Sequence, residues 1–143
     1  EILNMGSNKL VLPVDMVIAN AFDNNAERKT IPVGNVPAGW RVLDIGPETI
    51  KVFSNLIKNA ATVVWNGPMG VFEMPNFAKG TFEIAKAVAE SNSISIIGGG
   101  DSVAAIQESG LADKITHIST GGGASLEMLE GIVLPGVAAL QDK

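Results

Sequence analysis

Two apolar, β-prone runs in this chain each end directly in three consecutive glycines, and a helix-like segment follows each triplet. The triplets are residues 98–100 and 121–123. A helix N-terminus carries unsatisfied N–H groups and about half a positive charge, and glycine lets an anion approach that backbone closely. Two such loops at neighbouring strand ends would bind one polyphosphate together. The triplets therefore indicate nucleotide chemistry on an α/β scaffold.

Composition limits the classes of partner. The chain has 143 residues, 46% of them hydrophobic, which suffices for one domain with a core. A net charge of −5 argues against a nucleic-acid partner, and no apolar run approaches the ~20 residues of a membrane span. The absence of cysteine excludes disulfides and fits a cytoplasmic location. We interpret the start at Glu1, without a methionine, as a cut through a longer protein.

Strands alternate with helices along most of the chain. We expect short strands at 10–12, 16–19, 30–33, 42–45, 62–65, 94–97 and 116–119. Helices are predicted from Pro47 to about residue 60 and over 76–90, 101–109 and 122–130. This order favours an α/β fold: a three-layer, doubly wound, Rossmann-like and mostly parallel sheet, present as a partial domain. In such sheets ligands bind beyond the carboxyl ends of the strands, where both triplets and residues 66–68 fall.

The first triplet leads into two residues that suit phosphate chemistry. Asp101 is either the N-cap of its helix or a Mg²⁺ ligand beside phosphates, because Mg²⁺ takes one or two carboxylates together with phosphate oxygens. Ser102 either donates to a phosphate or lies in the first helical turn. A single triplet also suits tight strand–helix packing, and neither triplet fits a P-loop or G-x-G-x-x-G. The presence of two triplets favours anion binding.

A loop rich in proline and glycine carries the remaining candidates. Glu73 has a carboxylate that could accept two hydrogen bonds from ribose hydroxyls, or it is an ordinary solvated side chain. Leu43, Pro68 and Val71 are either apolar walls for a base or residues of the core.

Longer motifs in the chain resemble phosphoglycerate kinase. Residues 64–73 (VWNGPMGVFE) are similar to the signature loop of that family, and residues 97–102 (IGGGDS) and 117–127 (HISTGGGASLE) to its two phosphate loops. LPVD at 12–15, LDIGP at 43–47 and LPGV at 134–137 also match. These motifs are long, ordered and specific, and the likeness runs from about Leu12 to the C-terminus.

The resemblance implies a two-domain glycolytic enzyme that transfers a phosphoryl group between 1,3-bisphosphoglycerate and Mg-ADP, giving 3-phosphoglycerate and Mg-ATP. Residues 1–143 would then be the C-terminal portion of its nucleotide-binding domain, without the N-terminal substrate domain. By motif, Asp101 would be the metal ligand, Ser102 would contact a nucleotide phosphate, and Asn66 would lie near the phosphates. Gly99 and Gly100 would supply backbone near the nucleotide, and Glu73 would bind the ribose. The resemblance also implies contact with the transferring phosphoryl for Thr120, Gly121 and Gly122, and the adenine pocket for Leu43, Pro68 and Val71.

Two features of the chain limit what it does alone. Neither triplet has an adjacent lysine or arginine, although phosphoryl transfer needs cationic groups on the moving charge. Val42, where the family often has glycine, lies beside the implied adenine pocket and changes its expected shape. We therefore expect the isolated chain to be inactive and prone to self-association, and the full-length enzyme to be a monomer. The alternative is a stand-alone nucleotide-binding module without catalysis.

Overall fold

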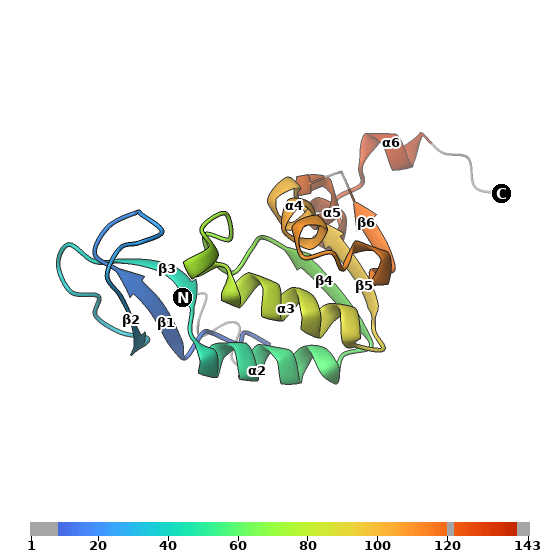
Figure 1. Cartoon of the computed structure of the whole chain (residues 1–143). Helices are drawn as coiled ribbons and strands as arrows, with labels where there is room; N and C mark the ends of the chain where they lie inside the picture. Colours follow the sequence, from blue (N-terminus) through green and yellow to red (C-terminus); the bar gives the residue numbers. More distant parts are fainter. Residues whose placement is uncertain (1–8, 120–121, 140–143) are drawn as a thin grey trace.

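The computed structural model describes residues 9–119 and 122–139 of the chain (Figure 1). The secondary-structure elements, in chain order, are β1 (Asp15–Ala19), β2 (Arg28–Pro32), β3 (Arg41–Ile45), α2 (Pro47–Lys58), β4 (Thr62–Asn66), the 3₁₀ turn η1 (Pro75–Phe77), α3 (Lys79–Glu90), β5 (Ile94–Gly98), α4 (Gly100–Glu108), the 3₁₀ turn η2 (Ala112–Lys114), β6 (His117–Ser119), α5 (Gly122–Leu129) and α6 (Pro135–Ala138). Most bounds lie within two residues of those predicted from sequence.

The strands form two separate three-stranded sheets. In the second, β4, β5 and β6 run parallel in that order, which is the parallel sheet predicted from the alternation of strands and helices. The first sheet, in the order β2–β1–β3, is antiparallel, with a bulge between Val17 and Ile18. The α/β class is confirmed, and the antiparallel sheet is an addition that the sequence analysis does not contain.

Two local predictions are wrong. Residues 10–12 form no strand; they precede Pro13, which has no N–H to donate to a ladder, and their side chains are exposed. The helix expected from residue 76 begins at Lys79 instead. Before it, the amide of Phe77 donates to the carbonyl of Met74 at 2.8 Å in a 3₁₀ turn, and the amide of Asn76 donates to Asn24 Oδ1 at 3.0 Å. These two hydrogen bonds hold residues 75–77 in a 3₁₀ turn, so the α-helix begins only after them.

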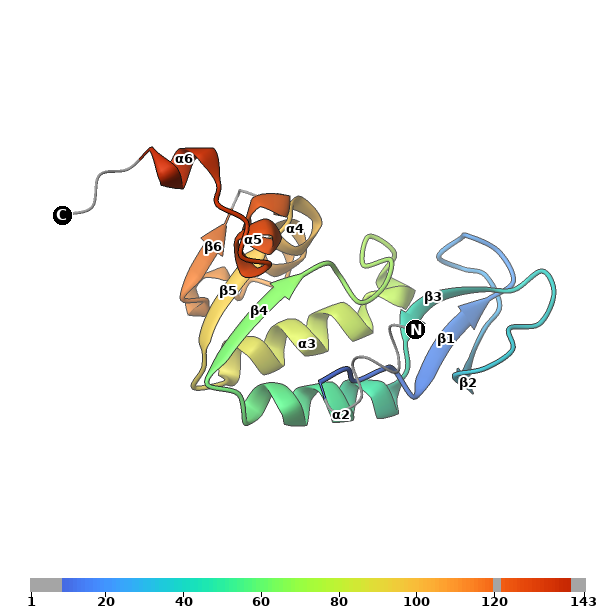
Figure 2. The same ribbon diagram turned by 180° about the vertical axis from the view of Figure 1, so that it is seen from behind.

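Helices lie on both faces of the parallel sheet. Figures 1 and 2 show α3 and α4 on one face and α5 on the other, with α2 alongside α3. The main core lies under α3 and α4. Burying each of its large side chains stabilises the fold by about 1.5–3 kcal/mol. The buried residues of this cluster are Ile45, Trp65, Ile84, Ala85, Val88, Ile97 and Ile106.

The other face of the parallel sheet is only partly covered. Val64 and Ile94 are 37% and 56% exposed, although β-branched residues in a parallel sheet are normally buried on both faces. Leu10, Val11 and Leu12 are exposed as well. The described structure therefore presents apolar surface that another polypeptide segment could cover.

The start of α2 is capped by a side chain from a distant strand. Asp15 of β1 accepts hydrogen bonds from the amides of Glu48 (3.0 Å) and Thr49 (2.7 Å) and from the Thr49 hydroxyl (2.6 Å). Burial by itself raises the pKa of the Asp15 carboxyl, but these hydrogen bonds outweigh that effect and hold the pKa below its ordinary value. This cap joins the antiparallel sheet to the helical layer.

None of the helices in the described part of the chain combines the length and the apolar character that a membrane span needs.

Candidate functional site

The three parallel strands end at the same level. Asn66 of β4 is the register partner of Gly98 of β5, which is the partner of Ser119 of β6. The loops that follow these residues therefore leave one edge of the sheet beside each other. This confirms the expectation that the two triplets follow neighbouring strands.

The first triplet forms the junction between β5 and α4. Gly99 is the N-cap of α4, with φ of +87°, and no side chain caps this helix. A Cβ atom on Gly99 would collide with the amide oxygen of Asn66, so only glycine fits here. Among the described residues, no side chain accepts from the first N–H groups of α4, an arrangement that suits an anion.

Asp101 is the second residue of α4 and is exposed. The hypothesis that it is the N-cap is wrong, because Gly99 occupies that position and the helix has no side-chain cap. The carboxylate is thus presented at the edge of the sheet where the three strands end. Among the described residues, no group of three or more acidic, histidine or cysteine side chains gathers there or elsewhere to hold a metal ion.

The second triplet falls partly outside the described residues. Thr120 and Gly121 are among the residues that the structure does not describe, and their implied contact with the transferring phosphoryl stays a prediction. Gly122 is the first residue of α5, which follows β6. The junction therefore has the same strand–glycine–helix order as the first one.

The structure brings together two of the three residues implied for the adenine pocket, Leu43 and Val71. Leu43 of β3 is buried with Ala19 and Phe77, and Val71 packs half-buried against this cluster. The amide of Val71 also donates to the carbonyl of Leu43 at 2.9 Å. Pro68 lies half-buried in the same loop, and Glu73 is exposed two residues beyond Val71.

Two buried hydroxyls hold the loop that carries these residues. Ser102, fully buried in α4, accepts a hydrogen bond from the amide of Gly67 at 2.5 Å. Thr81, fully buried in α3, accepts from the amides of Met69 (3.1 Å) and Gly70 (3.2 Å). Sequence reasoning gave Ser102 either a phosphate contact or a place in the first helical turn, where it does lie, and did not consider Thr81. No local signal identifies Thr81, because its partners lie 11 and 12 residues earlier.

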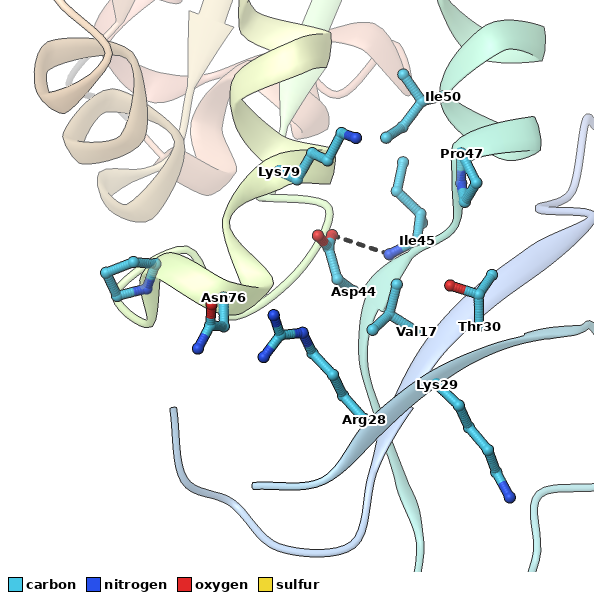
Figure 3. A pocket seen from close by; sticks show the side chains of 11 residues that line it. Val17, Arg28, Lys29, Thr30, Asp44, Ile45, Pro47, Ile50, Asn76 and Lys79 are labelled. Carbon is cyan, nitrogen blue, oxygen red and sulfur yellow. Dashed lines mark hydrogen bonds between the residues drawn. The ribbon is translucent and has the colours of Figure 1, made fainter. Parts of the chain in front are cut away.

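A hollow of about 540 Å³ lies between the antiparallel sheet and the starts of α2 and α3 (Figure 3). Asp44 of β3 lies at its centre, with Arg28 and Lys79 on its walls. The Asp44 carboxylate accepts hydrogen bonds from the amides of Ile45 (2.9 Å) and Gly80 (2.8 Å). None of the residues lining the hollow is among those implied for nucleotide binding, so it is separate from the edge where the strands end.

Asp44 predicts an unusual pH dependence of stability. Burial raises its pKa from the ordinary value of 3.8 to about 6, against the opposing effect of the Gly80 and Ile45 amides. Between those two pH values the folded protein binds a proton that the unfolded chain does not, so stability falls as pH rises towards 6. A shift of about two units corresponds to about 3 kcal/mol. Asp15, whose pKa is lowered, acts in the opposite direction only below pH 3.8.

We therefore expect urea unfolding midpoints to rise when the pH is lowered from 7 to 4.5. Asp44→Asn should abolish this rise, whatever its effect on overall stability. Asp113→Asn, which changes an exposed carboxylate of η2, is the control and should retain the rise. A wild-type midpoint that is flat or falls over this range would refute the role given to Asp44.

With the geometry in place, comparisons with known proteins decide the family. The model of the family described as "Phosphoglycerate kinase" matches residues 1–132. The chain belongs to the phosphoglycerate kinase family. It is 65% identical to the phosphoglycerate kinase of Roseiflexus castenholzii over 134 residues and 64% identical to that of Chloroflexus aurantiacus over 137 residues. The structure of phosphoglycerate kinase from Coxiella burnetii aligns with a TM-score of 0.87 at 40% identity, covering 94% of this chain and 35% of that one.

The match extends over nearly all of this chain but not over its relatives. Each of the two curated relatives is matched over 94% of this chain and 34% of its own length. The chain therefore spans about a third of the length of the relatives that it matches.

Proposed function

We propose that this chain supplies much of the nucleotide site of a phosphoglycerate kinase. The reaction is phosphoryl transfer between 1,3-bisphosphoglycerate and Mg-ADP, giving 3-phosphoglycerate and Mg-ATP. The observation that carries the proposal is the level ending of β4, β5 and β6, each followed by a glycine-containing loop, in a chain of this family. Ligands of open α/β sheets bind at this edge.

The proposal assigns each part of the nucleotide to one of the loops. Phosphates would lie at the start of α4, where no side chain in the described part of the chain accepts from the first N–H groups. The base would lie against the loop that packs on β3, and the exposed Glu73 carboxylate would accept from the ribose. The proposed contacts are Asn66, Gly99, Gly100, Asp101 and Ser102 for the phosphates, Leu43, Pro68 and Val71 for adenine, and Thr120, Gly121 and Gly122 for the transferring phosphoryl.

A magnesium ion fits this arrangement. Mg²⁺ prefers oxygen ligands and is usually bound through one or two carboxylates together with phosphate oxygens and waters. Asp101 is an exposed carboxylate next to the proposed phosphate position, and it is the residue that would hold the ion. When bound, Mg²⁺ neutralises charge on the phosphate oxygens. The chain's own part is to present this carboxylate and the α4 amides on a rigid edge.

The cationic groups that transfer requires are not beside the triplets. Lys114, the nearest in sequence, lies in η2, directly before β6, and so near the opposite end of that strand. We propose that the relatives' remaining length supplies these groups and the phosphoglycerate site, and that this chain alone does not turn over. We further propose that it self-associates through its exposed apolar surface, that the complete enzyme is monomeric, and that it acts in the cytoplasm.

Two preparations test the proposal. The first is this chain, titrated with Mg-ADP by calorimetry, with light scattering to record its oligomeric state. The second is a chimera in which the chain replaces the matching segment of the Chloroflexus aurantiacus enzyme, here called the Chloroflexus chimera. We expect the chain to bind Mg-ADP without turnover and the chimera to show kinase activity in a coupled assay. Binding by the chain with a folded but inactive chimera would favour a nucleotide-binding module, and no binding by either would overturn the proposal.

A further inference from the structure

The loop between β4 and η1 has almost no regular structure, yet every backbone amide of residues 67–71 donates a hydrogen bond. Gly67 donates to Ser102 Oγ, and Met69 and Gly70 both donate to Thr81 Oγ1. Val71 donates to the carbonyl of Leu43. Pro68 has no N–H. The backbone of residues 67–71 is therefore bound to three other elements, α4, α3 and β3.

The two hydroxyls come from the helices that cover the sheet on this side. Thr81 lies in the first turn of α3 and Ser102 in the first turn of α4, and both are fully buried. A buried hydroxyl cannot exchange its protein partner for water, so breaking its hydrogen bond leaves the partner amide unsatisfied. Each hydroxyl therefore fixes the position of the amides that donate to it. Ser102 directly follows Asp101, so its bond to Gly67 also fixes the loop relative to that carboxylate.

We propose that Thr81 and Ser102 are positioning residues that hold loop 67–71 in the shape that receives the nucleotide. This inference rests on the proposed function. In this role each side chain acts through the loop backbone, which carries Pro68 and Val71. The Ser102 hydroxyl thus has a partner within the protein, the Gly67 amide, in addition to the proposed phosphate contact of this residue. The loop is held before any ligand arrives, which lowers the ordering cost of binding.

The chain offers a closely matched control for Thr81. Thr49 is also a fully buried helical threonine, and its hydroxyl also accepts from two amides, those of Val14 and Asp15, both at 3.0 Å. Its partners are the first residue of β1 and the residue before it, and neither belongs to loop 67–71. Thr→Val is nearly isosteric and removes the bonds from both amides at either position. At Thr49 it also removes the bonds that the hydroxyl donates to the carbonyl (2.9 Å) and the carboxylate (2.6 Å) of Asp15. Both variants therefore lose stability, Thr49→Val at least as much as Thr81→Val, and only Thr81→Val loosens the loop.

The first measurement is the Kd for Mg-ADP of the chain, with the Chloroflexus chimera tested in parallel. We expect Thr81→Val to raise Kd by about tenfold, the effect of roughly one net hydrogen bond, and Thr49→Val to leave it within about twofold. Thr81→Ser, which restores the hydroxyl, should return Kd to within about twofold of wild type. Equal effects of the two valine variants, or failure of serine to rescue, would overturn the proposal.

A second measurement needs no nucleotide. Hydrogen exchange at the Met69 and Gly70 amides, taken relative to the core amide of Ile97, should quicken by about tenfold in Thr81→Val and stay unchanged in Thr49→Val. If wild type fails to bind Mg-ADP, the proposed function fails while this exchange ratio still decides the positioning role. An unchanged ratio in Thr81→Val overturns it.

Ser102 has its own matched pair on the same helix. Ser102→Ala removes the acceptor of the Gly67 amide, whereas Ser109→Ala removes a hydroxyl that donates to the carbonyl of Ile106 at 2.7 Å near the end of α4. We expect exchange at Gly67 to quicken only in Ser102→Ala. The same response in both variants would show that α4 has been loosened as a whole and would contradict a specific role for Ser102.

Discussion

Asp101→Ala in the Chloroflexus chimera is expected to reduce turnover by about a hundredfold or more while leaving its unfolding midpoint nearly unchanged. A metal ligand stabilises charge in the transition state by several kcal/mol, and each ~1.4 kcal/mol is tenfold in rate. The structural contribution of Asp101 is small, because its carboxylate is exposed and does not cap α4. An acidic residue in the first turn of a helix contributes only about 0.3–1 kcal/mol.

The control for this prediction lies on the same helix. Glu108 is exposed at the last position of α4, and Glu108→Ala should change neither turnover nor the unfolding midpoint by a measurable amount. The Mg²⁺ concentration needed for half-maximal rate should rise in Asp101→Asn, which keeps the size of the side chain. Near-normal turnover in Asp101→Ala, with a clear loss of stability, would leave Asp101 a structural residue only.

Gly70→Ala is expected to destabilise the chain by about 2–3 kcal/mol and to weaken Mg-ADP binding with it. A Cβ atom there would lie 2.6 Å from the carbonyl oxygen of Leu43 and 2.8 Å from the Cα of Asp44. Both are backbone atoms of β3, which pairs with β1 and cannot withdraw without loss of those hydrogen bonds. The loop must therefore move away from β3, and its bonds to Thr81 and Leu43 are lost.

Gly34→Ala is the matched control for that substitution. A Cβ atom on Gly34 would meet nothing within 4 Å, and its φ is not positive, so alanine should fit with an effect within about 0.5 kcal/mol. Urea unfolding of both variants, followed by titration with Mg-ADP, measures the two effects. A Gly70→Ala protein as stable as the Gly34→Ala protein would show that the loop tolerates a shift away from β3.

Local sequence patterns account for those features of the protein that depend on neighbouring residues. The helix at Pro47 and the strands β4, β5 and β6 follow from local pattern, because proline suits the first helical turn and β-branched runs suit buried strands. The motifs around both glycine triplets likewise identified the family. Even the level ending of the parallel strands was predictable, since such strands direct their carboxyl ends to one edge.

Strand direction, the N-cap of α4 and the partners of the buried hydroxyls depend on residues far apart in the chain, and these features are seen only in the folded structure. Short strands such as β1 and β3 have the same local pattern whether they pair parallel or antiparallel, so their direction was not predictable. The N-cap of α4 is Gly99 rather than Asp101, and the Asn66 side chain, from another strand, leaves no room for a Cβ atom at that position. Thr81 and Ser102 took their roles in the same way. A hydroxyl accepts from whichever amide the fold brings to it, and here those amides lie between 11 and 35 positions away.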